Sequence, residues 1–430
     1  MQFMLLALAA VMASVSAMTL NLPLYSRATK PAARGSTKFH LPVSARQPDS
    51  GVNVPVTDWF SRTDNQWYTT FAVGTPPQDL TAYFDTGSIQ FFIPQSNCTT
   101  CDNLTLFEPD SSTTFSPLPG TEGSSYFTTG PDSIPLSRPM TLSCRSVHDT
   151  VSLSWAQLKV DRQSFSLCDQ YAGAASKSTI SGIMGMGIWD PSVNNTPWYW
   201  NLVHDGQLES PFFSFYIPPG DLDGGQVTLG GMDKSKVDGN ISWTDLNVTA
   251  SHELSAYIID QSAIYADGKK LRIDVLKGSA SPTSRSYAIL DTGVAFMQTP
   301  DYGTAKYIYA QISPNITQID PAGAWGAPCD QMDDIAPDLT FTLGAPGKAL
   351  NLTIPKKYFN LGEYPRQPGM CQALFNHPVK GGDLIYDDAG VWIAGSPLLD
   401  KYYTVWDGVG LRIGWGKLPG LPGFNVSGST

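Results

Sequence analysis

The chain has 430 residues, of which 42% are hydrophobic, 11% aromatic and 15% charged, and its formal net charge is −11. This length allows two or more domains with substantial cores, and the composition is that of a globular protein rather than a disordered chain. The negative charge argues against nucleic acid or an anionic membrane as a partner.

The first 17 residues predict a signal peptide, because they are uncharged, carry an apolar run over residues 3–12 and end in the small-x-small pattern Val-Ser-Ala. This run is shorter than the roughly 20 residues of a membrane span. Residues 418–430 are rich in Gly and Pro and lack the hydrophobic tail of a GPI signal. We therefore expect an exported protein without a membrane anchor.

Residues 18–48 contain five Lys or Arg and no acid, so this segment carries +5 and residues 49–430 carry −16 of the total −11. Attraction between the two parts near neutral pH predicts a propeptide that stays bound to the rest of the chain until acid protonates the carboxylates that hold it. We expect the propeptide to span residues 18–55 and the mature chain to begin between Asp49 and Asp64. A disordered linker of incidental charge is the alternative.

From Trp59 onward, short strand-like runs alternate with clusters of Gly, Pro, Asn and Ser. Convincing helical patterns are scarce, and residues 198–209 are one of the few candidates. The chain is therefore expected to be mostly β.

The four residues 85–88, Asp-Thr-Gly-Ser, return 206 residues later as Asp-Thr-Gly-Val at 291–294. Each copy follows an apolar, strand-like run, so each Asp lies where a strand ends in a turn. The Gly two residues on allows a sharp turn and the close approach of another chain. A single Asp-Thr-Gly is usually a surface turn, but two copies in the same context predict two similar halves.

A second pair of apolar-apolar-Gly runs has nearly the same offset. Residues 183–185 begin 98 residues after Asp85 and residues 393–395 begin 102 residues after Asp291. The repeat therefore covers whole lobes. If the two lobes pack about an approximate twofold axis, the two Asp turns meet at their interface and two carboxylates share one site.

Several motifs in order carry a resemblance to a known family. They are Phe-Asp-Thr-Gly-Ser at 84–88, Gly-Ile-Met-Gly-Met-Gly at 182–187, Val-Thr-Leu-Gly-Gly-Met-Asp at 227–233, Leu-Asp-Thr-Gly at 290–293 and Tyr-Tyr-Thr-Val-Trp-Asp at 402–407. From about Trp67 to about Trp415, the chain resembles the pepsin family of aspartic proteases.

The resemblance implies a mostly β, bilobal pepsin-like acid protease fold, with the active-site cleft between two similar β lobes. We expect the N-terminal lobe at residues 56–237, the C-terminal lobe at 238–420 and a tail at 421–430. It makes Asp85 and Asp291 the catalytic pair. The residues that would support the active-site loops are Thr86, Gly87, Ser88, Thr292 and Gly293.

The chemistry of such a pair follows from electrostatics. Like charges about 3 Å apart cannot both ionise cheaply, so the two carboxyls share a proton over an acidic range; the dyad of aspartic proteases is the standard case of this effect. The ionised Asp would activate a water and the protonated Asp would stabilise the oxyanion. No metal or cofactor is expected, and the sequence does not say which Asp holds the proton.

Two departures from the family pattern concern Asp291 and the flap. Val294 stands where the family usually has Ser or Thr, so Asp291 lacks a hydrogen bond and should stay protonated more readily. In the family, a hairpin called the flap covers the cleft and bears a Tyr. Tyr126 is the candidate for this Tyr. Residues 127–130 copy the flap sequence poorly, the stretch that follows is longer, and Phe92 replaces a Trp that often backs the flap. An exposed aromatic residue on an ordinary strand is the alternative for Tyr126.

Six cysteines in an exported chain suggest three disulfides. A small Cys98–Cys101 loop is favoured over a zinc or redox site, because a second Cys-x-x-Cys is missing and the five His show no ligand spacing. The resemblance pairs Cys98 with Cys101 and Cys329 with Cys371, which leaves Cys144 and Cys168 to each other, a bridge outside the family's usual pattern.

Candidate glycosylation sites are Asn97, Asn103, Asn194, Asn240, Asn247, Asn315, Asn351 and Asn425.

Together these features predict a secreted, monomeric aspartic endopeptidase that is made as a zymogen and cuts polypeptides at acidic pH. Its own propeptide would be an intramolecular inhibitor. The alternatives are an enzyme delivered to an acidic vacuole, and a catalytically silent relative that binds peptides or a partner protein in the same cleft. A glycosidase with two carboxylates gains no specific support from the repeat.

Overall fold

The computed structural model describes residues 51–59, 66–130, 132–172, 180–188, 196–218, 224–273, 286–378, 391–421, 423 and 425–426. The expected signal peptide and residues 18–50 of the expected propeptide lie outside these ranges. So do Asn194 and most of the expected tail.

The first half of the described chain consists mainly of strands. These are β1 (Val52–Trp59), β2 (Gln66–Val73), β3 (Gln78–Asp85), β4 (Phe91–Pro94), β5 (Ser116–Pro117), β6 (Gly123–Phe127), β7 (Met140–Leu153), β8 (Leu158–Ala172), β9 (Gly182–Gly185), β10 (Phe212–Tyr216) and β11 (Gly225–Leu229). The helix in this half is α1 (Trp198–His204).

The second half repeats this preference for strands. Its strands are β12 (Ser242–Asp245), β13 (Ile258–Ala266), β14 (Lys269–Lys270), β15 (Ser286–Leu290), β16 (Met297–Gln298), β17 (Thr317–Gln318), β18 (Trp325–Pro328), β19 (Leu339–Leu343), β20 (Leu350–Ile354), β21 (Asn360–Glu363), β22 (Met370–Ala373), β23 (Phe375–Asn376), β24 (Val391–Ala394), β25 (Tyr402–Asp407), β26 (Arg412–Lys417) and β27 (Asn425–Val426). Its helices are α2 (Val248–Leu254), α3 (Tyr302–Ile312), α4 (Cys329–Ile335) and α5 (Ser396–Leu399).

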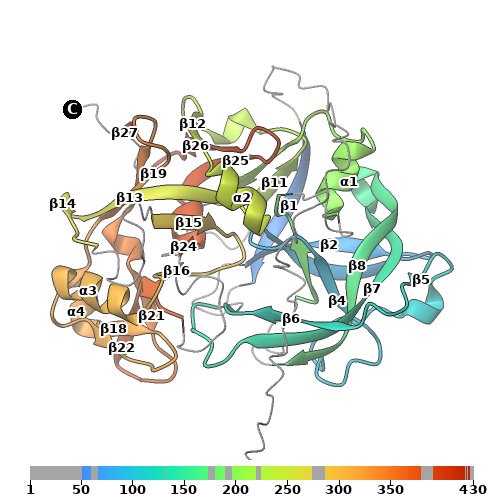
Figure 1. Ribbon diagram of the computed structural model, residues 1–430, viewed down its shortest axis with the longest axis horizontal. Helices are drawn as coiled ribbons and strands as arrows, with labels where there is room; N and C mark the ends of the chain where they lie inside the picture. Colours follow the sequence, from blue (N-terminus) through green and yellow to red (C-terminus); the bar gives the residue numbers. More distant parts are fainter. Residues whose placement is uncertain are drawn as a thin grey trace, which may run out of the picture.

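Within the described residues, the largest sheet joins the two halves in the strand order β12-β26-β25-β10-β11-β1-β2-β3-β9-β4-β8-β7-β5. Figure 1 shows the first half in blue to green on the right and the second half in yellow to red on the left. A second sheet, β23-β16-β24-β15-β13-β19-β20-β27, belongs to the second half. The mostly β, two-lobed architecture is as predicted.

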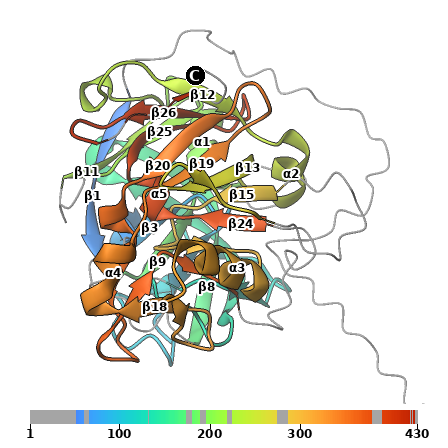
Figure 2. The same ribbon diagram turned by 90° about the vertical axis from the view of Figure 1, so that its left-hand side faces the viewer.

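The repeat seen in the sequence corresponds to one structural device used twice. β3 pairs in parallel with β9, with Asp85 opposite Gly185, and β15 pairs in parallel with β24, with Leu290 opposite Ala394. Figure 2 shows β15 and β24 side by side. The apolar-apolar-Gly runs are therefore the partner strands of the two Asp-bearing strands.

The burial of these strands follows their sequences. In β3, the side chains of Leu80, Ala82 and Phe84 point into the core and alternate with more exposed positions, which is the period of a strand with one buried face. β9 and β24 are buried at every position, as expected for parallel strands covered on both faces. Each Asp-bearing strand therefore lies beside a fully buried partner.

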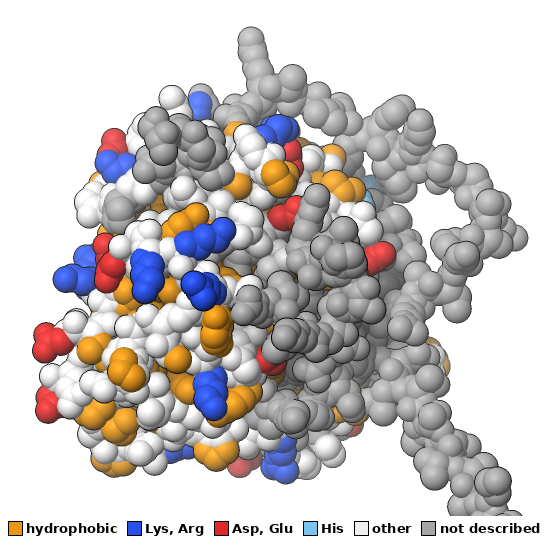
Figure 3. Space-filling view, turned by 60° about the vertical axis from the view of Figure 1, so that its left-hand side comes forward, with side chains coloured by type: hydrophobic (Ala, Val, Ile, Leu, Met, Phe, Trp, Pro, Cys, Tyr) orange, Lys and Arg blue, Asp and Glu red, His pale blue; other side chains and the backbone are white. Residues whose placement is uncertain are grey.

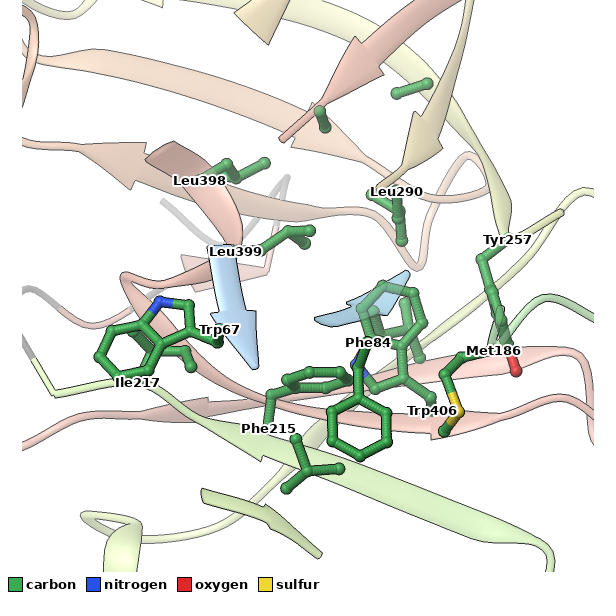
Figure 4. Packing of buried hydrophobic residues seen from close by; sticks show 14 of the residues in the cluster. Trp67, Phe84, Met186, Phe215, Ile217, Tyr257, Leu290, Leu398, Leu399 and Trp406 are labelled. Carbon is green, nitrogen blue, oxygen red and sulfur yellow. The ribbon is translucent and has the colours of Figure 1, made fainter. Parts of the chain in front are cut away.

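An aromatic core lies where the two halves meet, beneath the Asp-bearing strands (Figure 4). The ring of Phe84 packs on Phe215 at 6.4 Å between centroids, Phe215 packs on Trp406 at 6.2 Å, and Trp406 packs on Tyr257 at 4.8 Å. The Leu290 N–H donates to the Tyr257 carbonyl at 2.9 Å. The residues that precede both Asp are thus tied to one continuous core.

The helix expected over residues 198–209 is present but shorter. α1 ends at His204, and two residues later Gly206 has a left-handed φ of 68°, a conformation that favours Gly and stops a helix. Among the residues described, none of the helices combines the length and apolar character that a membrane crossing needs.

β1 is an interior strand of the large sheet. Val52 to Val56 pair with β11, and Thr57 to Trp59 pair with β2. The propeptide boundary expected at residue 55 therefore falls inside β1. The boundary between the lobes, expected at 237/238, falls in the connection between β11 and β12.

All six cysteines are paired as expected. Cys98 bonds to Cys101, Cys329 at the start of α4 bonds to Cys371 on β22, and Cys144 bonds to Cys168. Cys144 and Cys168 are direct cross-strand partners on β7 and β8, with Cα atoms 3.9 Å apart. This unusual bridge therefore fastens two neighbouring strands of one lobe.

The surface of the second lobe shows how the charge is distributed. On the face in Figure 3, several Lys and Arg side chains lie near one another, and Asp or Glu side chains stand beside some of them. The acidic balance of the chain is therefore not concentrated on this face.

Candidate active site

Asp85 and Asp291 each stand at the end of an Asp-bearing strand. Asp85 is the last residue of β3, and its carbonyl accepts a hydrogen bond from the Met186 N–H at 2.7 Å. Asp291 follows β15 directly, and its N–H donates to the Ala394 carbonyl at 3.0 Å. The parallel partner strand therefore fixes the backbone of both residues.

Glycines in the partner segments allow the Asp loops to fold close to them. A Cβ atom on Gly185 would lie 2.6 Å from the Gln90 nitrogen, and one on Gly395 would collide with the carbonyl oxygen of Val294. Any larger side chain would push the loops out of place. The expectation of close packing beneath the first active-site loop is confirmed.

The two loops exchange hydrogen bonds in a symmetric pattern. The Thr86 N–H donates to Thr292 Oγ1 at 3.1 Å, and the Thr292 N–H donates to Thr86 Oγ1 at 3.0 Å. Each hydroxyl then donates across the interface, Thr86 to the Leu290 carbonyl at 2.9 Å and Thr292 to the Phe84 carbonyl at 2.8 Å. These four bonds lock the two turns together in the way the resemblance implied.

The carboxyl groups meet between the turns. Asp85 Oδ1 accepts from the Gly87 N–H at 2.9 Å, and Asp291 Oδ1 accepts from the Gly293 N–H at 2.8 Å. A Cβ atom on Gly293 would lie 2.7 Å from Asp85 Oδ1, and one on Gly87 would collide with the Asp291 carboxyl. Each carboxyl therefore packs on the glycine of the opposite turn, and the two carboxyls are close enough to shift each other's pKa.

The surroundings of the two carboxyls differ at one position. Ser88 Oγ donates to Asp85 Oδ2 at 2.5 Å. Val294 has no donor to offer Asp291, and its buried side chain packs with Phe296 and Ile393. The second loop thus replaces a hydrogen bond with an apolar contact.

This difference separates the proton affinities of the pair. Burial raises the pKa of Asp85, but hydrogen bonds from Ser88, Asp291 and the Gly87 N–H offset part of this rise. Burial raises the pKa of Asp291 well above its usual range, and the charge of Asp85 and the hydrogen bond to it raise it further. The environment thus favours the shared proton on Asp291.

The flap candidate lies on β6. Tyr126 is half-buried and pairs with Thr141 of β7. Phe92, which stands where a Trp was expected, is fully buried and packs on Phe127 with ring centroids 5.4 Å apart. The aromatic residue at 92 therefore supports Phe127, the neighbour of the flap candidate.

The connection from β6 to β7 carries contacts that sequence reasoning missed. Its residue Ser133 is fully buried and hydrogen-bonds to Gln372 and Asn376 of the second lobe. The only sequence signal was the unusual length of this stretch.

The glycosylation candidates occupy different environments. Asn97, Asn103, Asn240 and Asn315 are exposed. Asn247 caps α2, and its amide nitrogen donates to Asp260 at 2.9 Å, so a glycan on that nitrogen would break this bond. Asn351 is half-buried and accepts a hydrogen bond from Thr342. The exposed sites thus remain the better candidates, while Asn194 and the side chain of Asn425 lie outside the described structure.

No group of three or more His, Cys, Asp and Glu side chains in the described part of the chain lies close enough to hold a metal ion. Cys98 and Cys101, whose spacing also fits a metal pair, form a disulfide instead. The chemical groups gathered at the interface are therefore the two carboxyls and their hydrogen-bond donors.

Comparisons with known proteins agree with this geometry. The family model for eukaryotic aspartyl protease matches residues 66–418. The chain is 28% identical to cathepsin D of Homo sapiens over 363 residues, which cover 82% of this chain and 81% of the relative. It is 25% identical to pepsin A of Sus scrofa over 382 residues, 88% of each chain, and 25% identical to cathepsin E of Aquarana catesbeiana over 361 residues, 82% and 79%. The chain therefore belongs to the eukaryotic aspartyl protease family.

Proposed function

We propose that the protein is a secreted aspartic endopeptidase, made as a zymogen, that hydrolyses peptide bonds within polypeptides at acidic pH. The observation that carries this proposal is the contact between the carboxyls of Asp85 and Asp291, each held by the N–H of the Gly two residues on. Two carboxyls that share one proton supply an acid and a base in the same site. Membership of the family supports the same assignment.

Asp85 is the base in this mechanism and Asp291 the acid. Hydrogen bonds from Ser88 and Gly87 favour the ionised form of Asp85. Asp85 takes a proton from a water held between the carboxyls, and the water oxygen bonds to the peptide carbonyl carbon. Asp291 donates a hydrogen bond to the carbonyl oxygen as negative charge builds on it.

The second step returns the pair to its starting state. Asp85, now protonated, gives its proton to the peptide nitrogen as the carbon–nitrogen bond breaks. The products are a carboxylic acid and an amine, and one proton remains on the pair. Thr86 and Thr292 act as positioning residues, because they hold the two carboxyls in register without touching the substrate.

The zymogen proposal rests on charge. The +5 of residues 18–48 faces −16 on the rest of the chain, and acid neutralises the carboxylates that hold the basic segment. Incubating purified precursor over a pH series and following its mass tests this step. We expect shortening only at acidic pH; a precursor that keeps its full mass at every pH would contradict self-activation.

We propose secretion as a monomer, with delivery to an acidic vacuole as the alternative. The uncharged apolar run near the start of the chain supports export. Exposed glycosylation candidates such as Asn97 and Asn103 fit passage through the secretory pathway.

The direct test of an endopeptidase is the identity of its products. Mature protein is incubated with an acid-denatured protein at about pH 3.5, within the ordinary carboxylate range, and the products are identified by mass spectrometry. We expect internal peptide bonds to be cut. Intact substrate that remains bound to the protein would instead support the second candidate function, a catalytically silent relative that binds peptides. Val294, which stands where the family usually has Ser or Thr, favours this second candidate.

A further inference from the structure

The connection between β6 and β7, which the structure describes at residues 128–130 and 132–139, contacts the second lobe through Ser133. Gln372 Nε2 donates to the Ser133 carbonyl at 2.7 Å, and Asn376 Nδ2 donates to the same carbonyl at 2.8 Å. The Ser133 hydroxyl donates to Gln372 Oε1 at 3.3 Å. All three residues are fully buried, and Figure 1 shows this connection extending from β6 toward the second lobe.

The two amide side chains form a prearranged pair. Gln372 Nε2 also donates to Asn376 Oδ1 at 3.0 Å, which fixes both amides relative to each other. Together they direct two N–H donors at a single main-chain carbonyl. A main-chain carbonyl is the group that every peptide presents whatever its side chains, so such a pair suits recognition of an extended backbone.

Asp132 lies next to Ser133, and its negative charge acts on Arg366 of the second lobe. Burial lowers the pKa of Arg366, but its hydrogen bond to Asp320 and nearby negative charges, among them Asp132, raise it overall. Arg366 is itself paired with Asp320 at 2.9 Å. The negative charge of Asp132, the neighbour of Ser133, is therefore complementary to the positive charge of Arg366 in the second lobe.

The pairing of the strands places this contact close to the catalytic pair. Asn376 lies on β23, which pairs with β16, and β16 pairs with β24. The Ala394 carbonyl at the end of β24 accepts the Asp291 N–H. Neighbouring strands lie about 4.8 Å apart, so β23 is about 10 Å from β24. An extended peptide covers that distance in about three residues.

We propose that the segment around Ser133 occupies one peptide-binding subsite of the enzyme. In this arrangement Gln372 and Asn376 hold the Ser133 carbonyl where they would otherwise hold a main-chain carbonyl of the substrate, about three residues from the bond that is cut. This inference rests on the proposed endopeptidase function. It predicts that the enzyme gains nothing from substrate residues that extend into this subsite.

Nested peptides test the proposal. Peptides with one scissile bond are lengthened from two to five residues on either side, and kcat/KM is measured for each. With the wild-type enzyme we expect kcat/KM to stop rising at about the third residue on one side. When residues 129–138 are replaced by a short Gly-containing turn, the longer peptides should gain three- to tenfold, because two hydrogen-bond donors become available to them.

The matched control separates this gain from a general effect of shortening. The same short-loop variant that also carries Gln372→Ala and Asn376→Ala should lose the gain while it still cuts the short peptides. A gain that persists without the two amides, or equal length profiles for the wild type and the short-loop variant, would overturn the proposal. Absence of cutting by the wild type would contradict the proposed function instead.

Hydrogen exchange tests the same contact without shortening the loop or using activity. The Ile134 N–H donates to Asp132 Oδ1 at 3.0 Å, inside the docked segment. We expect slow exchange at this amide in the wild-type protein, and exchange at least tenfold faster in the full-length Gln372→Ala, Asn376→Ala variant. Equal exchange in the two proteins would show that the amides do not hold the segment.

Discussion

At the scale of single residues, the asymmetry of the catalytic pair depends on one side chain. Val294 is buried beside the loop of Asp291, while Ser88 donates a hydrogen bond to Asp85. A donor to a carboxylate stabilises its charged form. The difference between Val and Ser therefore favours a proton on Asp291.

Val294→Thr is the nearly isosteric test of this asymmetry. The new hydroxyl can donate to Asp291 and lower its pKa, so the high-pH limb of the kcat/KM profile should move to lower pH by about one unit, equivalent to ~1.4 kcal/mol. Val294→Ala, which adds no donor, serves as the control and should leave the limb in place. Superimposable profiles for wild type and Val294→Thr would contradict this role.

The threonine pair can be tested through stability. Thr86→Val removes the hydroxyl that accepts from the Thr292 N–H and donates to the Leu290 carbonyl. Leaving these groups unpaired should cost about 2–4 kcal/mol of unfolding free energy. Thr86→Ser keeps the hydroxyl and should cost less than about 1 kcal/mol. Urea unfolding compares them, and equal losses would show that the hydrogen bonds contribute little.

The meeting of the two Asp-Thr-Gly loops could be predicted from the sequence, whereas the contact of Ser133 could not. Asp85, Thr86 and their repeats lie in short motifs whose spacing reports the geometry. Ser133 is 239 residues from Gln372, and no local periodicity relates two such positions. Val294 predicted that Asp291 holds its proton more readily, whereas the burial that raises the pKa of both carboxyls became visible only in three dimensions.

At the scale of elements, β1 limits where the proposed processing can cut the chain. Val54 and Val56 are buried, and β1 pairs with β11 along residues 52–56 and with β2 along residues 57–59. A cut within β1 would expose these side chains and leave strand edges unpaired. Composition alone showed a change from basic to acidic sequence, but it did not show that the strand starts at Val52.

We therefore expect processing before β1. Mass spectrometry of the active, secreted form should find an N-terminus at or before Val52. This places the boundary a few residues earlier than residue 55. An active form that begins after Trp59 would contradict the structural role of β1.

At the scale of the whole molecule, the dyad destabilises the fold as the pH rises. Both carboxyls have a raised pKa in the folded protein, so folding takes up protons there. Their contribution to stability is full below the ordinary Asp pKa of about 3.8 and is lost as the pH rises through the folded values. The burial of the two carboxyls therefore makes their contribution to folding more favourable in acid than at neutral pH.

Asp291→Asn should remove the part of this dependence that comes from Asp291, whose pKa is raised furthest. Compared with wild type, the variant should gain stability at pH 7 relative to pH 3, by about 1.4 kcal/mol for each unit of the raised pKa. Urea unfolding of freshly mixed samples, followed by tryptophan fluorescence, measures this difference in unfolding free energy between pH 7 and pH 3. Asp320→Asn is a control of opposite sign, because hydrogen bonds from Tyr364 and others lower the pKa of Asp320 despite its burial. An equal effect of Asp291→Asn at both pH values would contradict the pKa assignment.

In the proposed mechanism, Asp85 and Asp291 act together on a water. Its most direct test is cleavage of a denatured protein from about pH 2 to 7 by correctly processed wild type, Asp85→Asn and Asp291→Asn, each shown to be folded. We predict acid-dependent cutting by the wild type and a loss of at least a thousandfold in both variants, since neither carboxyl can do the work of the pair alone. Full activity in either variant, or none in the wild type, would contradict the claim.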